Sequence, residues 1–322
     1  MNFVDKYIRA GKRIALFQYV GDFFFGITPS WWLNARRRRW LRNWESRPDA
    51  DYLRMRRDHY CQLETPVALD LEKAVRIKDV RIGNFQSRYA MDARKALRYF
   101  PKDAMVSLID GDVRVNPRYP ALIKARRLDD ECAENAVILN LDSYRHWLRP
   151  KDSIPFDKKI PKLLFRGDIY GKPARIEFFR RWASHPLMDL GDTNRSHPSE
   201  WQTDFISVPD HFKYQFILAL EGYDVASALQ WIMASNCVPV MTRPAVESWL
   251  MHGRLIPGVH YIEISPDFSD VGEKMEYYVN HPVEARKISV ESKKWASQFF
   301  NRKRERLVSL LVVDKYLRMT QG

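Results

Sequence analysis

Between residues 211 and 264 the chain alternates apolar segments of strand length with segments of helical length, and this rhythm constrains the fold more than any other feature. The predicted strands span residues 214–220, 238–241 and 259–264, and the segments between them that are predicted as helical span 226–236 and 246–252. A parallel connection needs about a dozen residues or more and usually contains a helix, so the alternation predicts a parallel sheet. Ligands of such sheets bind beyond the carboxyl ends of the strands. The loop after the first strand is therefore a candidate site.

A first α/β lobe is predicted upstream of this stretch. Apolar segments at 80–85, 104–109 and 136–141 resemble strands, and the segments 88–100 and 119–128 between them are predicted as helices. This alternation is typical of an α/β layer. Pro150, Pro155 and Pro161, with charged residues between them, predict a linker after the lobe.

A second lobe is predicted to begin with a strand at 162–165. Pro173 fits the first turn of a following helix, because the N–H that proline lacks is not needed there. Met188 and Leu190 predict the next strand. Beyond the central stretch, Asp270 and Glu273 have capping-box spacing for a helix, and residues 282–300 continue as helix.

The first 60 residues are basic and rich in aromatic side chains. Trp31, Trp32, Trp40 and Trp44 surround the run Arg36–Arg39. Aromatic rings beside arginines suit the headgroup level of a membrane, where each basic residue contributes about 1 kcal/mol on an anionic leaflet. The alternative is that the aromatic rings pack onto a core and the arginines form a solvated face.

The formal charge of +13 favours a polyanionic partner, such as a membrane face, a phosphorylated glycan or a nucleic acid. No nucleic-acid-binding motif accompanies the basic residues, so we expect no nucleic-acid partner. Cys61, Cys132 and Cys237 lack metal-ligand spacing and are odd in number, which favours a reducing cytosol. The charge-free run of residues 23–35 is shorter than the roughly 20 residues of a spanning helix, and no leader cleavage site is evident.

Asp110 and Asp112 follow a predicted strand, with Gly111 between them allowing a tight turn. One carboxylate could act as a general base on a sugar hydroxyl. The pair could instead hold a divalent metal on a nucleotide diphosphate. A plain turn with two solvated aspartates is the third possibility.

Two further sets of residues lie in the second lobe, one where a predicted strand passes into a helix and one in the central stretch. Helix N-termini after strands collect phosphate through N–H groups, and arginine adds donors that match phosphate. The alternative is that these residues have only structural roles. Ser227 would then cap a helix, Asp224 would be a turn residue, the cations would be solvated and His260 would belong to the core. The candidates are Arg166, Gly167, Lys172 and Arg175 in the first set, Lys213, Glu221, Gly222, Asp224 and Ser227 in the second, and His260 further along.

Several spaced motifs resemble glycosyltransferase family 90, which includes Rumi-type protein O-glucosyltransferases and capsule xylosyltransferases. The resemblance covers residues 160–300 well and the first lobe loosely. The amino-acid sequence of residues 221–226 is more similar to the bacterial lipopolysaccharide-core branch. The motifs are Phe165-Arg166-Gly167, Phe212-Lys213-Tyr214, Leu220-Glu221-Gly222, Ala226-Ser227, Ala234-Ser235-Asn236, Pro257-Gly258-Val259-His260-Tyr261 and Asp267-Phe268-Ser269-Asp270.

The resemblance implies an α/β fold with two Rossmann-like lobes of GT-B type, here with a basic, aromatic-rich N-terminal helical extension. It implies an inverting enzyme that uses a UDP-sugar without a metal cofactor. Asp112 matches the base of the eukaryotic members best, with Asp110 one alignment gap away. Arg166 and Arg175 match phosphate-side arginines, and Ser227 matches the serine of the donor loop.

Two positions depart from the eukaryotic pattern. Leu229 stands where those members have an arginine, and Asp168 stands where they have a serine. Other cations must then neutralise the diphosphate, and the resemblance leaves Arg175, Lys172 and Lys213 for that role.

We therefore expect a hexosyltransferase that moves glucose or galactose from UDP to the lipopolysaccharide inner core, on the cytoplasmic face of the inner membrane. The rivals are a metal-dependent Asp-x-Asp transferase and a basic module that binds anionic glycan or nucleic acid without catalysis. The expected parts are an N-terminal segment (1–60), an acceptor-side lobe (61–155), a nucleotide-sugar lobe (156–300) and a C-terminal helix (301–322).

Overall fold

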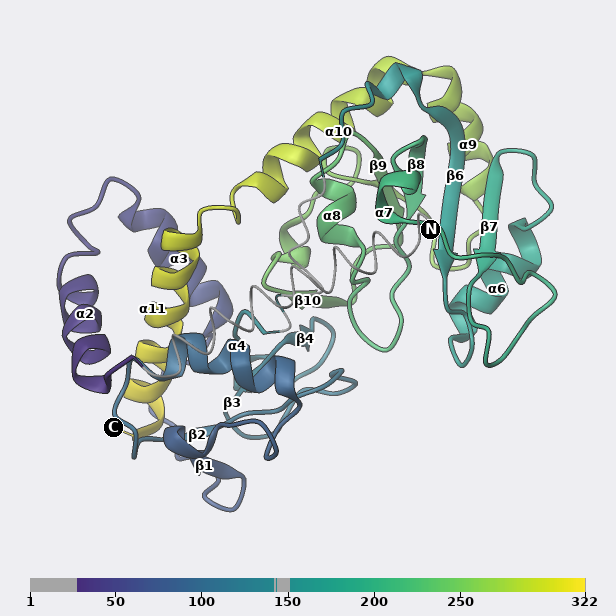
Figure 1. The fold of residues 1–322 in the computed structure, drawn as a ribbon. Helices are drawn as coiled ribbons and strands as arrows, with labels where there is room; N and C mark the ends of the chain where they lie inside the picture. The colour runs from purple at the N-terminus through teal and green to yellow at the C-terminus, as the bar shows by residue number, and fades with distance from the viewer. Residues whose placement is uncertain (1–27, 142, 144–150, 322) are drawn as a thin grey trace, which may run out of the picture. The chain divides into compact units, whose positions relative to one another are not determined.

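The computed structural model describes residues 28–141, 143 and 151–321 (Figure 1). The chain divides into two compact units, and its described residues are assigned accordingly. The first unit draws on Met1–Tyr144, Ala245–His252 and Phe299–Gly322, and the second on Arg145–Pro244 and Gly253–Gln298. Within the described residues, no helix combines the length and the apolar character needed to cross a membrane.

The second unit contains a five-stranded sheet in which all neighbouring strands run parallel, in the order β11-β9-β8-β6-β7. This confirms the parallel sheet predicted from the central stretch. The strands are β6 (Ile160–Gly167), β7 (Met188–Asp192), β8 (Tyr214–Leu218), β9 (Val238–Met241) and β11 (Ile262–Glu263).

Helices cover this sheet and supply most of its core. Phe178 and Phe179 of α6 are buried, and the Phe179 ring meets Phe165 of β6 edge-on at a centroid distance of 5.6 Å. Full burial of such a side chain contributes about 1.5–3 kcal/mol. The helices of this unit are α6 (Pro173–Trp182), α7 (Val208–His211), α8 (Leu229–Met233), α9 (Val271–Asn280) and α10 (Pro282–Ser297), with a 3-10 turn η3 (Phe156–Lys158).

The first unit combines short paired strands with longer helices. Its β1 (Ala74–Arg76) and β2 (Met105–Ser107) are antiparallel, whereas β3 (Ala121–Ile123) and β5 (Ala136–Ile138) are parallel. An isolated parallel bridge between Leu108 and Leu122 links these pairs. A third pair joins β4 (Ala125–Arg127) to β10 (Val246–Ser248), which is antiparallel to it.

The helices of the first unit gather around α11 (Arg302–Gln321), which lies alongside α3 (Ala50–Tyr60) in Figure 1. The other helical elements are α2 (Ser30–Arg42), α4 (Ser87–Leu97), η1 (Ile77–Asp79) and η2 (Ala133–Asn135), and the turn η4 (His252–Arg254) follows β10. The nonpolar side of α11 is buried, including Leu307, Val308 and Leu311.

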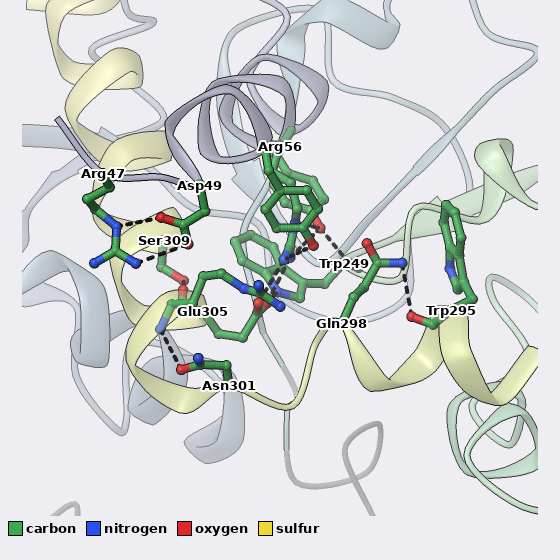
Figure 2. Close-up of polar contacts among 12 residues, drawn as sticks. Arg47, Asp49, Arg56, Trp249, Trp295, Gln298, Asn301, Glu305 and Ser309 are labelled. Atoms are coloured by element: carbon green, nitrogen blue, oxygen red, sulfur yellow. Dashed lines mark hydrogen bonds and ion pairs between the residues drawn. The ribbon is translucent and has the colours of Figure 1, made fainter. Parts of the chain in front are cut away.

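A buried ion pair joins α3 to α11. The Arg56 guanidinium donates to Glu305 Oε1 at 2.7 Å and to Oε2 at 2.8 Å, and the Trp249 indole N–H donates to Oε2 at 2.7 Å (Figure 2). Tyr60 stacks on Trp249 at 4.1 Å between ring centroids. Because both carboxylate oxygens have donors, the charge of Glu305 is compensated inside the unit.

Residues 119–128 form two strands, β3 and β4, so the helix predicted there is wrong. Their Ala, Leu, Lys and Arg residues favour a helix locally. Pairing with β5 and β10 overrides that preference, and every residue of the segment Ala121–Arg126 is buried.

Other predicted elements are shorter or displaced. Residues 80–85 contain only a bridge between Ile82 and Phe85, and 246–252 begins with strand β10 instead of a helix. The predicted helix 226–236 is limited to α8, with Ala228 at its N-cap, so Ser227 does not cap it. Asp270 accepts the Ser265 N–H at 2.8 Å and provides no side-chain cap to α9, so the predicted capping box is absent.

The aromatic residues of the N-terminal segment divide between two environments. Residues 1–27 lie outside the described part of the chain, so the structure describes only the rest of that predicted extension. Trp44 is buried, while Trp31 is 72% exposed and Trp32 is 42% exposed. The Arg36 guanidinium lies over both the Trp32 and Trp40 rings, at 5.1 and 4.7 Å from their centroids.

Candidate active site

The sheet of the second unit changes its direction of growth at β6. The chain continues from β6 to β7 on one side, returns to β8 on the other side, and then proceeds to β9 and β11. The connections that leave β6 and β8 thus diverge. In open α/β sheets the carboxyl ends of two such strands form the topological switch point, where ligands bind.

Arg175 of α6 ties these two strand ends together. Its Nη1 donates to the Asp168 carbonyl, just after β6, and its Nη2 donates to the Leu220 carbonyl, just after β8, both at 2.8 Å. No carboxylate in the described part of the chain forms an ion pair with it, and its Nε is buried without a partner. Burial lowers the pKa of Arg175 to about 10, opposed in part by the charge of Asp168, so the guanidinium stays protonated at neutral pH. Because these carbonyl groups are neutral, they do not cancel the charge of Arg175, and that charge can attract an anion.

Asp168 and Lys172 form the second part of this cluster. The Lys172 ammonium lies 2.5 Å from Asp168 Oδ2, and Asn194 Nδ2 donates to Oδ1 at 2.8 Å. Burial by itself raises the pKa of Asp168, but bonds from Lys172, Asn194 and the Tyr170 N–H lower it overall. Asp168 therefore offsets one of the two cations, and Arg175 keeps its charge.

Gly222 lies directly against both cations. A Cβ at this position would stand 3.4 Å from Arg175 Nη2 and 3.6 Å from Lys172 Cε. A larger side chain would cover the donors. Gly167 ends β6, and its carbonyl accepts the Thr193 N–H at 3.1 Å, which joins the neighbouring strand end to the cluster. The predicted residues Arg175, Lys172, Gly167 and Gly222 are thus brought together.

The other residues of the 221–227 loop differ in their environment. Glu221 is partly buried and directly precedes Gly222, whereas Asp224 is buried and its carbonyl accepts the Gly222 N–H at 3.1 Å. Ser227 is exposed ahead of α8. The loop therefore keeps its backbone compact around Gly222.

Arg166 contacts Asp189 of the neighbouring strand β7. Its Nη2 lies 2.5 Å from Asp189 Oδ1, and its Nη1 donates to the Asp189 carbonyl at 2.8 Å. Burial raises the pKa of Asp189, but hydrogen bonds from Tyr214 and Arg166 lower it overall. The charge of Arg166 is already compensated, in contrast to that of Arg175.

Lys213 and His260 lie at the amino edge of the sheet, away from the cluster. Lys213 precedes β8, its carbonyl accepts the Ile160 N–H at the start of β6, and its ammonium pairs with Asp210 at 2.7 Å. His260 precedes β11, is buried, and accepts the Ile256 N–H at Nδ1 at 2.9 Å. Burial lowers the pKa of His260, so it is neutral and has a structural contact.

In the first unit, Asp110 and Asp112 have different partners. Asp110 Oδ2 accepts the backbone N–H of Gln86, the N-cap residue of α4, at 2.6 Å. Asp112 is exposed, and its Oδ1 accepts from the ammonium of Lys124 at 2.9 Å. Gly111 between them has φ +87°, a conformation that glycine adopts without strain. Asp110 thus anchors a helix, while Asp112 presents a carboxylate to solvent.

Comparison with known proteins decides the family. The pattern of glycosyl transferase family 90 matches residues 135–316. The chain is 39% identical over 236 residues to O-glucosyltransferase LpsA of Dichelobacter nodosus, which covers 73% of this chain and 74% of that protein. The chain belongs to glycosyltransferase family 90. A more distant relative is protein O-glucosyltransferase 2 of Danio rerio, 31% identical over 148 residues, or 44% of this chain and 29% of that protein.

Family 90 membership confirms the resemblance seen in the sequence and gives the switch-point cluster a context of glycosyl transfer. Leu229, at the position of the eukaryotic arginine, is buried in α8 and carries no charge to this site. Among the described residues, no group of three or more His, Cys, Asp or Glu side chains is arranged to hold a metal ion.

Sequence reasoning missed two polar residues next to the candidates. Asn194 lies in the polar loop after β7, and its place just after a predicted strand was the signal in the sequence that could have found it. Lys124 falls in the segment that was predicted as a helix, where a lysine is expected to be solvated. Its burial follows only from the pairing of β3 and β4 with other strands.

Proposed function

We propose that this chain is an inverting glucosyltransferase that transfers glucose from UDP-glucose to a hydroxyl of the lipopolysaccharide inner core, with a heptose as acceptor. UDP-galactose is the alternative donor. Arg175 carries the proposal, because it is a partly buried cation at the switch point of a parallel sheet and has no carboxylate partner among the residues that the structure describes. Both named relatives are O-glucosyltransferases, which favours glucose.

The donor diphosphate is proposed to lie against Arg175 and Lys172, with Gly222 allowing it close to the backbone. Two of the five N–H groups of the Arg175 guanidinium are used by carbonyls, and the same two nitrogens each have another hydrogen for phosphate oxygens. As the bond between the sugar and the diphosphate breaks, negative charge grows on the UDP oxygen. Cations already in place stabilise that charge without rearranging.

Asp112 is the proposed general base, and Asp110 is proposed to be structural. The acceptor hydroxyl loses its proton to the Asp112 carboxylate while its oxygen attacks the anomeric carbon, and UDP leaves from the opposite face. The exposed carboxylate of Asp112 can reach a hydroxyl, whereas Asp110 is engaged with the N-terminus of α4. Inversion follows from a single displacement.

The reaction is proposed to need no metal ion. Each aspartate already accepts from a protein donor, Asp110 from the Gln86 N–H and Asp112 from the Lys124 ammonium. A dication bound to both carboxylates would face the Lys124 charge at close range, which disfavours it. Undiminished transfer in excess EDTA is the expected outcome, and a loss that added magnesium or manganese restores would favour the metal-dependent alternative.

We also propose that the protein acts on the cytoplasmic face of the inner membrane as a peripheral protein. Trp31 and Trp32 are exposed on α2, which also carries the exposed Arg38 and Arg42. Aromatic rings next to cations suit an anionic leaflet. Sedimentation with vesicles of phosphatidylglycerol, but not of phosphatidylcholine, is expected.

Product mass tests the activity directly. The purified chain is incubated with UDP-glucose, UDP-galactose or UDP-xylose and with lipopolysaccharide truncated at the inner core, and the product is weighed. A gain of one hexose with UDP-glucose supports the proposal, and a gain with UDP-galactose alone moves the donor assignment. No gain with any donor contradicts it.

A further inference from the structure

A cavity lies in the first unit, apart from every residue discussed as catalytic or donor-binding. It has a volume of about 410 Å³, within the range of small-molecule sites. Part of its wall is apolar, formed by Trp40 of α2 and Leu307 of α11. The polar residues that line it are Arg39, Asn43, Arg47, Asn301, Lys303 and Arg304.

The charge of this lining is all of one sign. Arg39, Arg47, Lys303 and Arg304 contribute four cations, and no carboxylate is part of the lining. Asp49 lies beside Arg47 and compensates its charge, accepting from the guanidinium at 2.7 and 3.0 Å (Figure 2). The hydrogen bond from Asp49 raises the pKa of Arg47, although burial opposes it.

Arg39 and Lys303 remain without an ion pair in the part of the chain that the structure describes, and both are exposed. Like charges that share a cavity repel one another and reduce stability. Proteins place like charges close together, against their mutual repulsion, mainly at functional sites. A bound anion would relieve the repulsion.

The side chains between the cations select the kind of anion. Asn301 Oδ1 accepts the Arg304 N–H at 3.1 Å, which fixes the Asn301 amide with its NH₂ group available as a donor. Asn43 adds a second amide on the α2 side. A single water occupies about 30 Å³ of liquid volume, and a phosphate group is only a few times larger. A free phosphate would therefore fill only part of the cavity. Amides that suit hydroxyls, together with cations that suit phosphate, match a phosphorylated sugar.

We propose that this cavity binds a phosphate group carried by a sugar, and that the sugar belongs to the acceptor glycan. The identity of the acceptor rests on the proposed function, whereas the sugar-phosphate site itself rests on the cavity. Arg39 and Lys303 bind the phosphate, and Asn43 and Asn301 contact hydroxyls of the same sugar. The site holds the acceptor, and it takes no part in bond making.

Calorimetric titration of the full chain with glucose 6-phosphate, glucose and inorganic phosphate tests the site. Glucose 6-phosphate is expected to bind, inorganic phosphate to bind several times more weakly, and glucose not to bind. Arg39→Gln and Lys303→Gln should each weaken binding of glucose 6-phosphate roughly five- to tenfold, as expected for one charge-assisted hydrogen bond. Arg38→Gln is the matched control, because it removes the same charge from an exposed position of α2 outside the lining.

Four results would overturn the proposal. The first is the absence of glucose 6-phosphate binding, and the second is equal binding of inorganic phosphate, which would leave an anion site without a sugar. The third is equal weakening by Arg38→Gln, which would indicate net charge alone. The fourth is retention of affinity in Arg39→Gln and Lys303→Gln with loss in Arg175→Gln, which would assign the binding to the switch point.

The two proposals fail separately. Binding that depends on Arg39 and Lys303, together with no mass gain from any UDP-sugar, would keep the cavity and reject the transfer reaction. Mass gain that is unchanged in Arg39→Gln, together with no glucose 6-phosphate binding, would keep the reaction and reject the cavity.

Discussion

The Lys124 ammonium lies 2.9 Å from Asp112 Oδ1, and the two side chains differ sharply in environment. The Lys124 side chain is 2% exposed, and the Asp112 side chain is 43% exposed. A buried cation thus holds an exposed carboxylate from beneath. Since a buried lysine has few rotamers left, the contact restricts the position of Asp112 as well as compensating its charge.

Replacing Lys124 with methionine is expected to reduce the maximal rate of transfer by on the order of ten- to a hundredfold, because the base loses the contact that positions it. The KM for UDP-sugar should change little, since Arg175 and Lys172 are the proposed donor-binding residues. Steady-state rates at varied donor concentration measure both values. Lys95→Met is the control, because it breaks a comparable contact of 2.8 Å with Asp92 on α4. A rise in KM with an unchanged rate would contradict the positioning role.

Asparagine should reduce transfer strongly at position 112 and hardly at all at position 110. Asp112→Asn is expected to lower transfer by about 10²- to 10⁴-fold, the usual contribution of a general base, while UDP still binds. Asp110→Asn should stay close to the wild-type rate, because an amide oxygen can still accept the Gln86 N–H. Product mass and UDP titration are measured on the same preparations. Loss of activity in Asp110→Asn alone would exchange the two assignments.

Two arginines of the second unit provide a matched pair for donor binding. Arg175→Gln is expected to weaken UDP binding by about 2 kcal/mol, roughly thirtyfold, because a charge-assisted phosphate contact is lost. Arg166→Gln should weaken UDP binding less, since Asp189 already holds that guanidinium. Titration calorimetry with UDP measures both variants. Equal losses would show that Arg175 has no special role.

Removal of one partner from the Arg56–Glu305 pair should be more damaging than removal of both. Glu305→Gln leaves the fully buried Arg56 without its counter-charge, and a loss of about 3–5 kcal/mol in the free energy of unfolding is expected. The double variant Arg56→Met/Glu305→Leu should recover part of that loss. Urea denaturation compares the three proteins. Additive losses would mean that the pair is not coupled.

The buried Glu247 carboxylate should make the free energy of unfolding depend on pH in the acid range. Burial raises the pKa of Glu247, but contacts with His59 and Arg126 outweigh it and lower that pKa to about 2, from an ordinary 4.5. The stabilisation is therefore complete above about pH 4.5 and disappears as the pH falls towards about 2. The difference corresponds to on the order of 3 kcal/mol. The deficit of Glu247→Gln relative to wild type, measured by urea denaturation, should shrink over that range, and a constant deficit would contradict the coupling.

The parallel sheet and its loops could be predicted because their signals are local. β9 is a continuous apolar segment and β8 is apolar apart from Gln215, while Gly167 ends β6 and Gly222 lies in the loop after β8. Residues 119–128 could not be predicted correctly, since their helix-favouring composition is overridden by pairing with β5 and β10, which come later in the chain. Similarly, nothing local distinguishes Arg175 from Arg166. Asp189 pairs with Arg166, whereas carbonyl groups accept from Arg175, and this difference depends on which strands are neighbours.

The sequence by itself determined the family, the parallel order of strand and helix in the second unit, and the residue types available for phosphate and proton chemistry. These follow from apolar periodicity and from short motifs, which are properties of neighbouring residues. Only the tertiary structure decided how the charges are placed. Lys124 pairs with Asp112, Asp189 pairs with Arg166, carbonyl groups accept from Arg175, and four cations line one cavity. Compensation depends on distances between residues far apart in the chain, and those distances are fixed only when strands pair and helices pack.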